Sequence, residues 1–192
     1  MWFDETGLFW LPLTPNVPVF ETALYFGTTG LMQAANFSVG VGTTMPFQYV
    51  GAPWFDGDVL AKELNSRNID GVYFMQRYSK ANIMNVTGKV KQWDVGSCDG
   101  VLIIISDRNA FRPVTTQLHI MDAILKCFPE HADLDPAFKV PGSIGHLNAR
   151  ERMCTDEVCE MAERGESLLP LIDKWKRSSE EFMKRREPFL LY

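Results

Sequence analysis

Apolar and polar positions follow two different periods along the chain, and strand-like patterns dominate its first half. Residues 101–105 read Val-Leu-Ile-Ile-Ile, an unbroken apolar run that predicts a strand buried on both faces. Residues 71–78 place Val, Phe and Met among Tyr and Gln, which predicts a second strand. The polar stretch 80–94 predicts a hairpin or loop around Gly88.

Helical patterns dominate the second half. The segments 113–128 and 149–165 predict two helices, because proline opens the first and glycine closes the second. A last helix is predicted over 168–184, and the apolar residues of 188–192 are expected to tuck back onto the domain. The face of this helix that is expected to be buried carries Leu171, Ile172, Trp175 and Phe182.

Two earlier segments also carry helical features. Residues 56–67 predict a helix with Asp56 or Asp58 as the capping residue. Residues 21–35 are ambiguous, because their apolar positions suit a helix while two glycines and a Tyr-Phe pair suit a strand. A short helix followed by an irregular turn is expected there. The apolar stripe of the 56–67 helix is Val59, Leu60 and Leu64.

The order of these elements favours an α+β fold. Strands that precede helices predict a small mixed or barrel-like sheet, covered on one side by the carboxy-terminal helices. Residues 1–18 are expected to form an extended leading segment, punctuated by prolines, and residues 19–192 the domain itself. The aromatic residues of the leading segment either contact another domain or pack on this domain's own surface. They are Trp2, Phe3, Phe9 and Trp10.

Composition and charge exclude several classes of function. The chain has 192 residues, of which 46% are hydrophobic, as in an ordinary globular domain. Its net charge of −5 and the absence of a basic stripe argue against nucleic-acid binding. No apolar run approaches the length of a membrane span, so none is expected. The first residues show no export signal, and the localisation stays open.

Cysteine and histidine are too scattered to predict a metal site or a disulfide. No C-x-x-C pair occurs, and the spacing of Cys154 and Cys159 fits no common zinc motif. Buried free thiols are therefore expected. His119 falls within an apolar helical stretch and is expected to be a packed residue rather than a ligand. The remaining members of the two sets are Cys98, Cys127, His131 and His146.

The most informative segment lies between residues 33 and 54. It interleaves glycine, threonine, serine and asparagine with Phe37, Phe47 and Trp54. Aromatic residues need a core to sit in, so an ordered loop is expected rather than a flexible linker. Glycine geometry and small polar groups beside aromatic walls suit the recognition of a hydroxyl-rich ligand such as a sugar. A purely structural turn is the alternative for any single residue of the segment.

This segment resembles the signature of the NamZ-type exo-β-N-acetylmuramidases, which runs roughly E-G-T-N-x-S-x-G-R-G-T-x-x-P-F-x-x-x-G-A-P-W. Further matching runs follow in the family's order, from residues 14–18 to residues 190–192, so the likeness covers nearly the whole chain. The signature positions that match are Asn36, Ser38, Gly40, Gly42, Thr43, Pro46, Phe47, Gly51, Ala52, Pro53 and Trp54.

The resemblance implies a carboxy-terminal domain that binds or shapes substrate without cleaving it. Family members are about twice as long, and their presumed catalytic glutamate lies in an amino-terminal Rossmann-like domain. In this chain Gln33 stands where the pattern has glutamate, and glutamine cannot shuttle a proton. Val41 replaces an arginine that would suit a carboxylate such as the lactyl acid of N-acetylmuramic acid. Loss of an ion pair as a unit, a changed ligand and simple drift all fit these two departures.

Three hypotheses follow. The first is the substrate-binding domain of a peptidoglycan glycosidase, which binds an N-acetylmuramyl sugar or peptidoglycan fragment, needs no cofactor and works with a catalytic domain elsewhere. The second is a degenerate, non-catalytic module that binds sugar or docks on a protein. The third, least favoured, is a stand-alone enzyme, because no spacing pairs its carboxylates. Those carboxylates would be Asp56, Asp58, Asp70 or Asp107.

Each candidate residue has an expected role. Asn36 and Ser38 either bind sugar hydroxyls or order the loop, and the loop glycines permit close backbone approach. Trp54 or Tyr78 is expected to stack on a sugar face. Arg108 is expected to contact a substrate carboxylate or another domain, or to pair with the aspartate before it. The substrate-binding candidates are Gln33, Asn36, Ser38, Gly40, Gly42, Thr43, Trp54 and Arg108.

Overall fold

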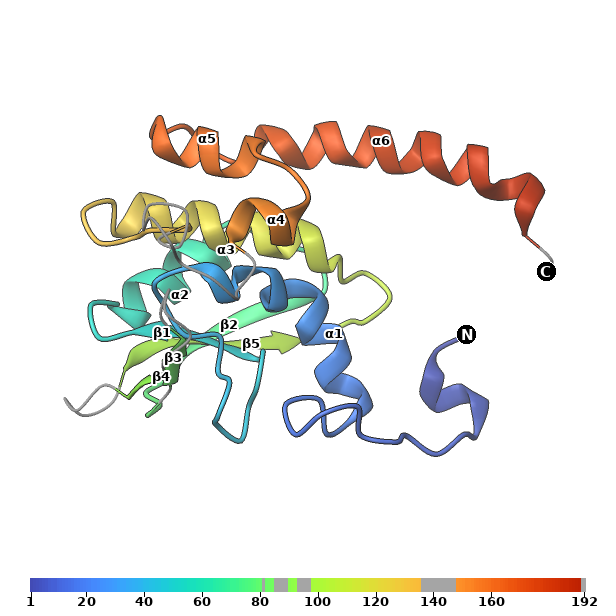
Figure 1. The fold of residues 1–192 in the computed structure, drawn as a ribbon, viewed down its shortest axis with the longest axis horizontal. Helices are drawn as coiled ribbons and strands as arrows, with labels where there is room; N and C mark the ends of the chain where they lie inside the picture. The colour runs from blue at the N-terminus through green and yellow to red at the C-terminus, as the bar shows by residue number, and fades with distance from the viewer. Residues whose placement is uncertain (81, 85–89, 93–97, 136–147, 191–192) are drawn as a thin grey trace.

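The chain folds into a small open sheet with helices stacked on one side of it (Figure 1). This arrangement confirms the α+β class. The computed structural model describes residues 1–80, 82–84, 90–92, 98–135 and 148–190.

The sheet has three antiparallel strands in the order β1-β5-β2. The central strand β5 (Asp99–Ile105) lies between β1 (Tyr49–Ala52) and β2 (Val72–Gln76). In its register, Ala52 is opposite Asp99 and Val72 is opposite Ile105. The sheet is simpler than the mixed or barrel-like one that the sequence predicts. Strand β1 was not predicted, because its four residues include a glycine and give too short a pattern.

Among the described residues, helices cover only one face of this sheet (Figure 1). Val101 and Ile103 of β5 are fully buried, whereas Leu102 and Ile104 on the other face are half-buried. On β2, Met75 points to the same open face and is 50% exposed. The prediction that residues 101–105 are buried on both faces was therefore wrong. An antiparallel sheet needs only one face packed on the core.

The polar stretch after β2 contains the predicted hairpin. Strands β3 (Asn82–Met84) and β4 (Val90–Gln92) pair antiparallel as a second, two-stranded sheet. Gly88, around which the hairpin was expected to turn, lies outside the described residues, as does His146.

The two helices predicted in the first half of the chain are both present. Helix α1 (Phe20–Thr29) leads into the 3₁₀ helix η2 (Gly30–Ala34) where an irregular turn was expected. Helix α2 (Gly57–Ser66) is capped by Asp56, whose side chain accepts a hydrogen bond from the Val59 amide. Val59 itself is 44% exposed and does not belong to the buried stripe.

Helix α3 (Pro113–Cys127) forms as predicted, but the helix predicted over 149–165 is two helices. Helix α4 (Ala149–Met153) ends at Cys154, whose φ of 54° is left-handed, and α5 (Glu157–Glu163) starts afresh beyond it. A left-handed residue cannot continue a right-handed helix.

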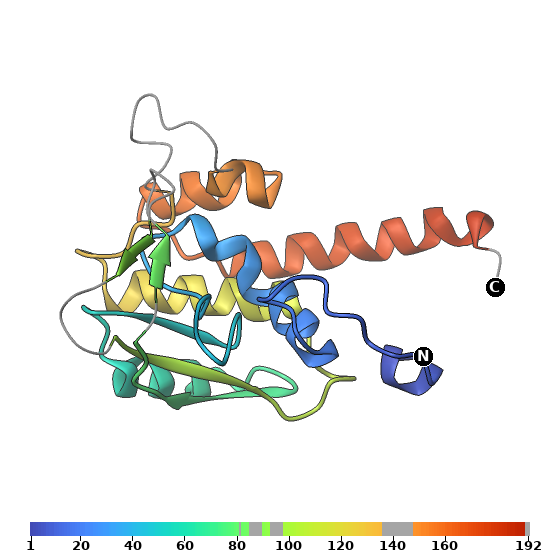
Figure 2. The same cartoon turned by 60° about the horizontal axis from the view of Figure 1, so that its bottom comes forward.

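Helix α6 (Pro170–Arg186) projects beyond the body of the domain, as Figures 1 and 2 show. Leu171 is buried, and Ile172 and Trp175 pack partly against the core, as predicted. Phe182 is 51% exposed, so its predicted burial was wrong. The chain continues into the 3₁₀ helix η3 (Glu187–Phe189), where Phe189 is exposed rather than tucked back, and residues 191–192 lie outside the described part.

The leading segment is not wholly extended, because it contains the 3₁₀ helix η1 (Phe3–Thr6). Its aromatic residues divide into two kinds. Trp2, Phe3 and Trp10 pack around Phe20 at the start of α1, with ring centroids 5.9 to 6.5 Å from that of Phe20. Phe9 is 84% exposed. The first three therefore pack on the domain's own surface, and only Phe9 is left open.

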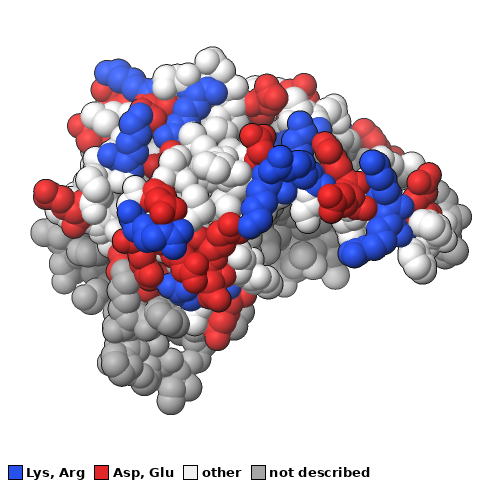
Figure 3. Space-filling model, turned by 90° about the horizontal axis from the view of Figure 1, so that it is seen from above, with Lys and Arg blue, Asp and Glu red and all other residues white. Residues whose placement is uncertain are grey.

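The prediction of buried thiols holds for two of the four cysteines. None of the four cysteines, which all lie in the described residues, forms a disulfide; Cys98 and Cys159 are buried, but Cys154 is exposed. His119 is half-buried on α3. Along α6, lysine and arginine alternate with aspartate and glutamate (Figure 3). Within the described segments, no helix combines the length and the apolar character needed to cross a membrane.

Candidate functional site

Residues 36–47 form a loop whose two ends are tied together by backbone hydrogen bonds. The Ser38 amide donates to the Gly51 carbonyl at 2.8 Å, and the Gly51 amide donates back at 3.0 Å. Nearer the tip, the Phe47 amide donates to the Val39 carbonyl at 2.8 Å. The loop is therefore anchored on β1 and has the ordered character that its composition predicts.

Short polar side chains hold the tip of this loop. The Ser38 hydroxyl accepts a hydrogen bond from the Gly40 amide at 3.1 Å. The Thr43 hydroxyl donates to the Gly40 carbonyl at 2.7 Å and accepts from the Met45 amide at 3.0 Å. Gly40 has a φ of 79°, and a Cβ there would lie 2.5 Å from the Met45 carbonyl oxygen. Gly42, with a φ of 83°, is exposed at the tip. Only glycine fits at position 40 without a shift of the backbone.

Asn36 and Trp54 both contact a second loop, residues 128–133, which follows α3. The Asn36 amide group donates to the His131 carbonyl at 2.7 Å, and its oxygen accepts from the Asp133 amide at 2.9 Å. The Trp54 ring stacks on the His131 imidazole, with centroids 5.6 Å apart and planes 28° apart. His131 is thus brought to the candidate site, although its isolation in the sequence gave no signal of this.

Gln33 lies against helix α4. The Arg152 guanidinium donates from Nη1 to the Gln33 side-chain oxygen at 3.4 Å. A positive charge therefore stands beside Gln33, although position 41 of the signature carries valine, which packs against the core. Sequence reasoning missed Arg152, because the two residues are 119 positions apart and no local pattern links them.

Arg108 lies apart from the other candidates and holds the leading segment. Its guanidinium is 2.6 Å from an Asp4 carboxylate oxygen and 3.3 Å from one of Glu5. It also sits over the Trp2 ring, 5.2 Å from the centroid. Trp54 comes shortly after strand β1, whose last residue pairs with Asp99 at the start of β5. Arg108 comes shortly after the opposite end of β5. A seven-residue strand spans roughly 20 Å, so the structure does not bring these two side chains together.

Comparison with known proteins identifies the family. Residues 24–192 match the family described as "Exo-beta-N-acetylmuramidase NamZ, C-terminal". The chain belongs to this NamZ family. It is 30% identical over 190 residues to the peptidoglycan β-N-acetylmuramidase NamZ of Bacillus subtilis (strain 168). That match covers 99% of this chain but 42% of the relative.

Two solved structures of DUF1343 family proteins from Bacteroides fragilis NCTC 9343 share the fold of this NamZ domain. One aligns with a TM-score of 0.78 at 24% identity and covers all of this chain and 47% of its own. The other aligns with a TM-score of 0.58 at 23% identity and covers 94% of this chain and 43% of its own. The chain spans less than half the length of each of these relatives.

Tyr49 is the first residue of β1, the strand to which the NamZ signature loop is anchored. Its side chain is buried, and its hydroxyl donates to the Cys98 carbonyl at 2.9 Å. Burial, with the nearby Cys98 and Asp99, raises the pKa of the Tyr49 phenol well above its usual value. Tyr49 therefore stays protonated and acts as a donor that joins β1 to the start of β5.

The isolated carboxylates of this NamZ domain hold local structure. Asp56 caps α2, and Asp58 pairs with Lys62 on the same helix. The Asp107 carboxylate accepts from the Asn109 amide at 2.8 Å. Asp70 is exposed at the edge of a groove under α6. These positions do not bring the four carboxylates into one catalytic arrangement.

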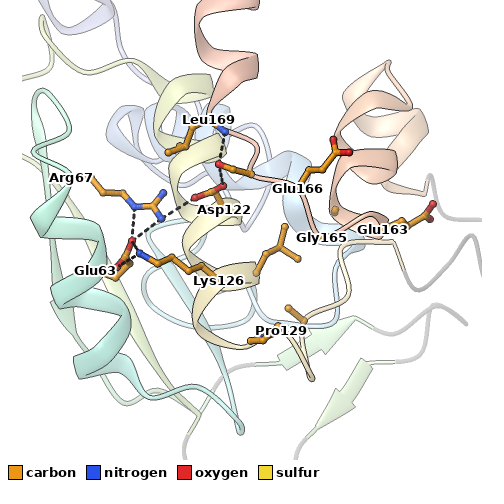
Figure 4. Close-up of a pocket in the computed structure, with 13 residues that line it drawn as sticks. Glu63, Arg67, Asp122, Lys126, Pro129, Glu163, Gly165, Glu166 and Leu169 are labelled. Atoms are coloured by element: carbon orange, nitrogen blue, oxygen red, sulfur yellow. Dashed lines mark hydrogen bonds and ion pairs between the residues drawn. The ribbon is translucent and has the colours of Figure 1, made fainter.

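A pocket of about 770 Å³ lies between α2, α3 and the turn before α6 (Figure 4). Arg67 on its wall is 2.8 Å from a Glu63 oxygen and 2.9 Å from an Asp122 oxygen. The Ser167 hydroxyl donates to the other Asp122 oxygen at 2.7 Å. This network joins three elements, and no residue that lines the pocket comes from the NamZ signature loop. Sequence patterns do not reveal this network, because its members come from distant segments.

Proposed function

We propose that this chain is the substrate-recognition half of a NamZ-type exo-β-N-acetylmuramidase. In this proposal it binds a terminal N-acetylmuramyl sugar of peptidoglycan and does not cleave the glycosidic bond on its own. The observation that carries the proposal is the rigid signature loop, in which Gly40 has a backbone that only glycine accommodates. The name of the B. subtilis relative, a peptidoglycan β-N-acetylmuramidase, supports the choice of ligand.

The loop's own contacts divide the candidate residues into supports and ligand-facing groups. Asn36, Ser38 and Thr43 are engaged in holding the loop and its neighbour, so their role is to order it. The ligand-facing groups are then the exposed Gly42 backbone, the Trp54 ring with His131, and the Gln33 amide. An aromatic face and a few fixed polar groups are the usual means of binding a sugar.

Arg152 gives this proposal its specificity. N-acetylmuramic acid differs from N-acetylglucosamine by a lactyl carboxylate, and guanidinium groups bind carboxylates well. Arg152 places a guanidinium beside Gln33. It would therefore supply, from α4, the positive charge that position 41 lacks.

The absence of catalysis by this chain alone follows from its carboxyl groups. Glycoside hydrolysis usually needs two carboxyl groups that flank the scissile bond. Asp56, Asp58 and Asp107 are engaged in capping, an ion pair and a turn, and Gln33 cannot transfer a proton. The catalytic groups would then belong to the part of the relatives that this chain does not match.

Calorimetric titration of the chain with N-acetylmuramic acid tests this assignment. We expect Arg152→Gln to weaken binding about tenfold, the usual value of one charge-assisted hydrogen bond. Arg108→Gln is the matched control and should leave binding unchanged, because Arg108 lies at the other end of β5. Equal effects of the two variants would argue against the proposed site.

The second candidate function is a docking module without sugar recognition. The exposed apolar side chains of the leading segment favour it: Leu8 is 67% exposed and Phe9 84%. No binding of N-acetylmuramic acid by the wild-type chain would favour this candidate.

A further inference from the structure

A closed ring of polar contacts joins the signature loop to helix α4. The Asn36 side-chain oxygen accepts from the Asp133 backbone amide, and the Asp133 carboxylate accepts from the Asp135 backbone amide at 3.1 Å. The Asp135 carboxylate in turn accepts from the backbone amide at the first position of α4, at 3.0 Å. Helix α4 carries Arg152, which contacts Gln33, three residues before the start of the ring. The ring therefore links the place of the Arg152 guanidinium to the signature loop.

Arg150 holds α4 to its neighbours within this ring. Its side chain is 14% exposed, and its guanidinium lies 3.7 Å from Asp135, 3.4 Å from Asp156 and 3.0 Å from Glu163. A different nitrogen makes each contact. Asp156 stands at the start of α5 and Glu163 at its end, and Asp135 is buried at 3% exposure. A guanidinium presents donors in several fixed directions, so one side chain fixes α4 to two other segments.

Helix α4 has little else to fix its direction. It is five residues long, all of them described, and Ala149 is the one that is buried. The capping box of Asn148 and Glu151 stabilises the turn itself but makes no contact outside it. Residues two positions apart lie roughly 200° apart around a helix. Arg150 therefore reaches α5 on one side of α4, while Arg152 faces Gln33 on the other.

We propose that Arg150 is a positioning residue for Arg152. By holding α4 to Asp135 and α5, it keeps the Arg152 guanidinium where the lactyl carboxylate of N-acetylmuramic acid would bind. The inference rests on the proposed function for its ligand, and it gives Arg150 no contact with the sugar. Pairing of a guanidinium with a carboxylate is directional, because two parallel hydrogen bonds need aligned groups. A tilt of α4 should therefore weaken binding of the acidic sugar and spare that of the neutral N-acetylglucosamine.

The test is a double-mutant cycle on the whole chain, with the affinities for both sugars measured by NMR titration. We expect Arg150→Gln to weaken binding of N-acetylmuramic acid about threefold or more and to leave binding of N-acetylglucosamine unchanged. In the Arg152→Gln background the same substitution should have no further effect, because the group that it positions is gone. A merely structural role would cost the same in both backgrounds, and that additive result would overturn the proposal.

Arg150→Lys separates position from charge. Lysine keeps the positive charge, but its single nitrogen cannot meet three carboxylates in the directions that a guanidinium does. It should lose nearly as much selectivity as Arg150→Gln, and it replaces that variant in the cycle if Arg150→Gln does not fold. Full selectivity in Arg150→Lys would contradict the proposal. Arg164→Gln is the matched control, since it removes an exposed ion pair with Glu166 at the end of α5, and both affinities should stay unchanged.

The side-chain amide of Gln33 reports on Arg152 without any sugar. In the free chain, Arg152→Gln should shift the NMR signals of this group, Arg150→Gln should shift them in the same direction, and Arg164→Gln should leave them in place. Unshifted Gln33 signals in Arg150→Gln would overturn the proposal. If the wild-type chain binds no N-acetylmuramic acid, the proposed function fails, and the Gln33 signals alone decide whether Arg150 positions Arg152.

Discussion

Asn36 and Asp133 are joined by two hydrogen bonds. The Asn36 backbone amide donates to the Asp133 carbonyl at 3.0 Å, and the Asp133 backbone amide donates to the Asn36 side-chain oxygen at 2.9 Å. A third bond runs from the Asn36 side chain to the His131 carbonyl. The signature loop is thereby fixed to the loop that carries the stacking partner of Trp54. Asn36 thus positions two parts of the proposed sugar site at once.

We expect Asn36→Ala to lower the free energy of unfolding by about 1–3 kcal/mol, because it leaves polar groups of the 131–133 turn without partners. Asn36→Asp keeps the acceptor oxygen but sets a carboxylate oxygen against the His131 carbonyl, so it should also destabilise the chain. Urea denaturation measures both. An Asn36→Ala protein that unfolds at the wild-type urea concentration would show that these bonds contribute little.

Gly40→Ala should destabilise the chain more than Gly165→Ala. Both glycines are left-handed, with φ of 79° and 67°, and a left-handed alanine costs roughly 1–2 kcal/mol in either place. A Cβ at Gly40 also meets the Met45 carbonyl oxygen at 2.5 Å, whereas one at Gly165 meets nothing. Thermal unfolding of the two variants isolates this clash. Equal losses would mean that the loop relaxes without cost.

Stability should fall in acid partly through Glu63. Hydrogen bonds from Lys126 and Arg67 lower the pKa of this carboxyl group in the folded chain. The unfolded chain therefore takes up a proton first, near the ordinary pKa of about 4.3. The stabilisation by Glu63 is present above that pH and is lost as the pH falls through the lower folded pKa.

Glu63→Gln should accordingly flatten the acid side of the stability curve. The measurement is the midpoint of thermal unfolding from neutral pH to about pH 3, for the wild type and the variant. Asp58→Asn is a suitable control, since it removes an exposed carboxylate on the same helix. Parallel curves for the wild type and Glu63→Gln would contradict the role given to this network.

Thiol reactivity should separate Cys154 from Cys159. Burial, aided by the nearby Asp135, raises the pKa of the Cys159 thiol to about 11, so little thiolate forms at neutral pH. Cys154 is exposed at the break between α4 and α5. Brief alkylation followed by peptide mass spectrometry should label Cys154 well before Cys159. Comparable labelling of both would indicate that α5 opens readily.

Local patterns were sufficient to predict the long elements of the fold. Pro113 at the first turn and a steady apolar period predicted α3, and the apolar run at 101–105 predicted β5. Local patterns failed where tertiary contacts decide. The four residues of β1 become a strand by pairing with β5, and Cys154 breaks a helix that periodicity alone would continue. Phe182 fits the apolar face of α6 but meets no core there.

The candidate site was predicted only in part, because only some of its contacts lie between residues that are close in the sequence. The loop around Gly40 is encoded by neighbouring residues, so its order was visible in the sequence. Arg152 and His131 reach the site from distant segments, and one sequence carries no mark of such contacts. The position of Arg108 depended on where β5 ends and on the path of the leading segment.

The most direct test of sugar recognition without cleavage is an NMR titration of the isolated chain with N-acetylmuramic acid. N-acetylglucosamine serves as the control, and release from a chromogenic muramide is followed in the same sample. We predict selective shifts of the Gly42 amide and the Trp54 indole by N-acetylmuramic acid, without turnover. Identical responses to the two sugars, no response, or release of the chromophore would contradict this account.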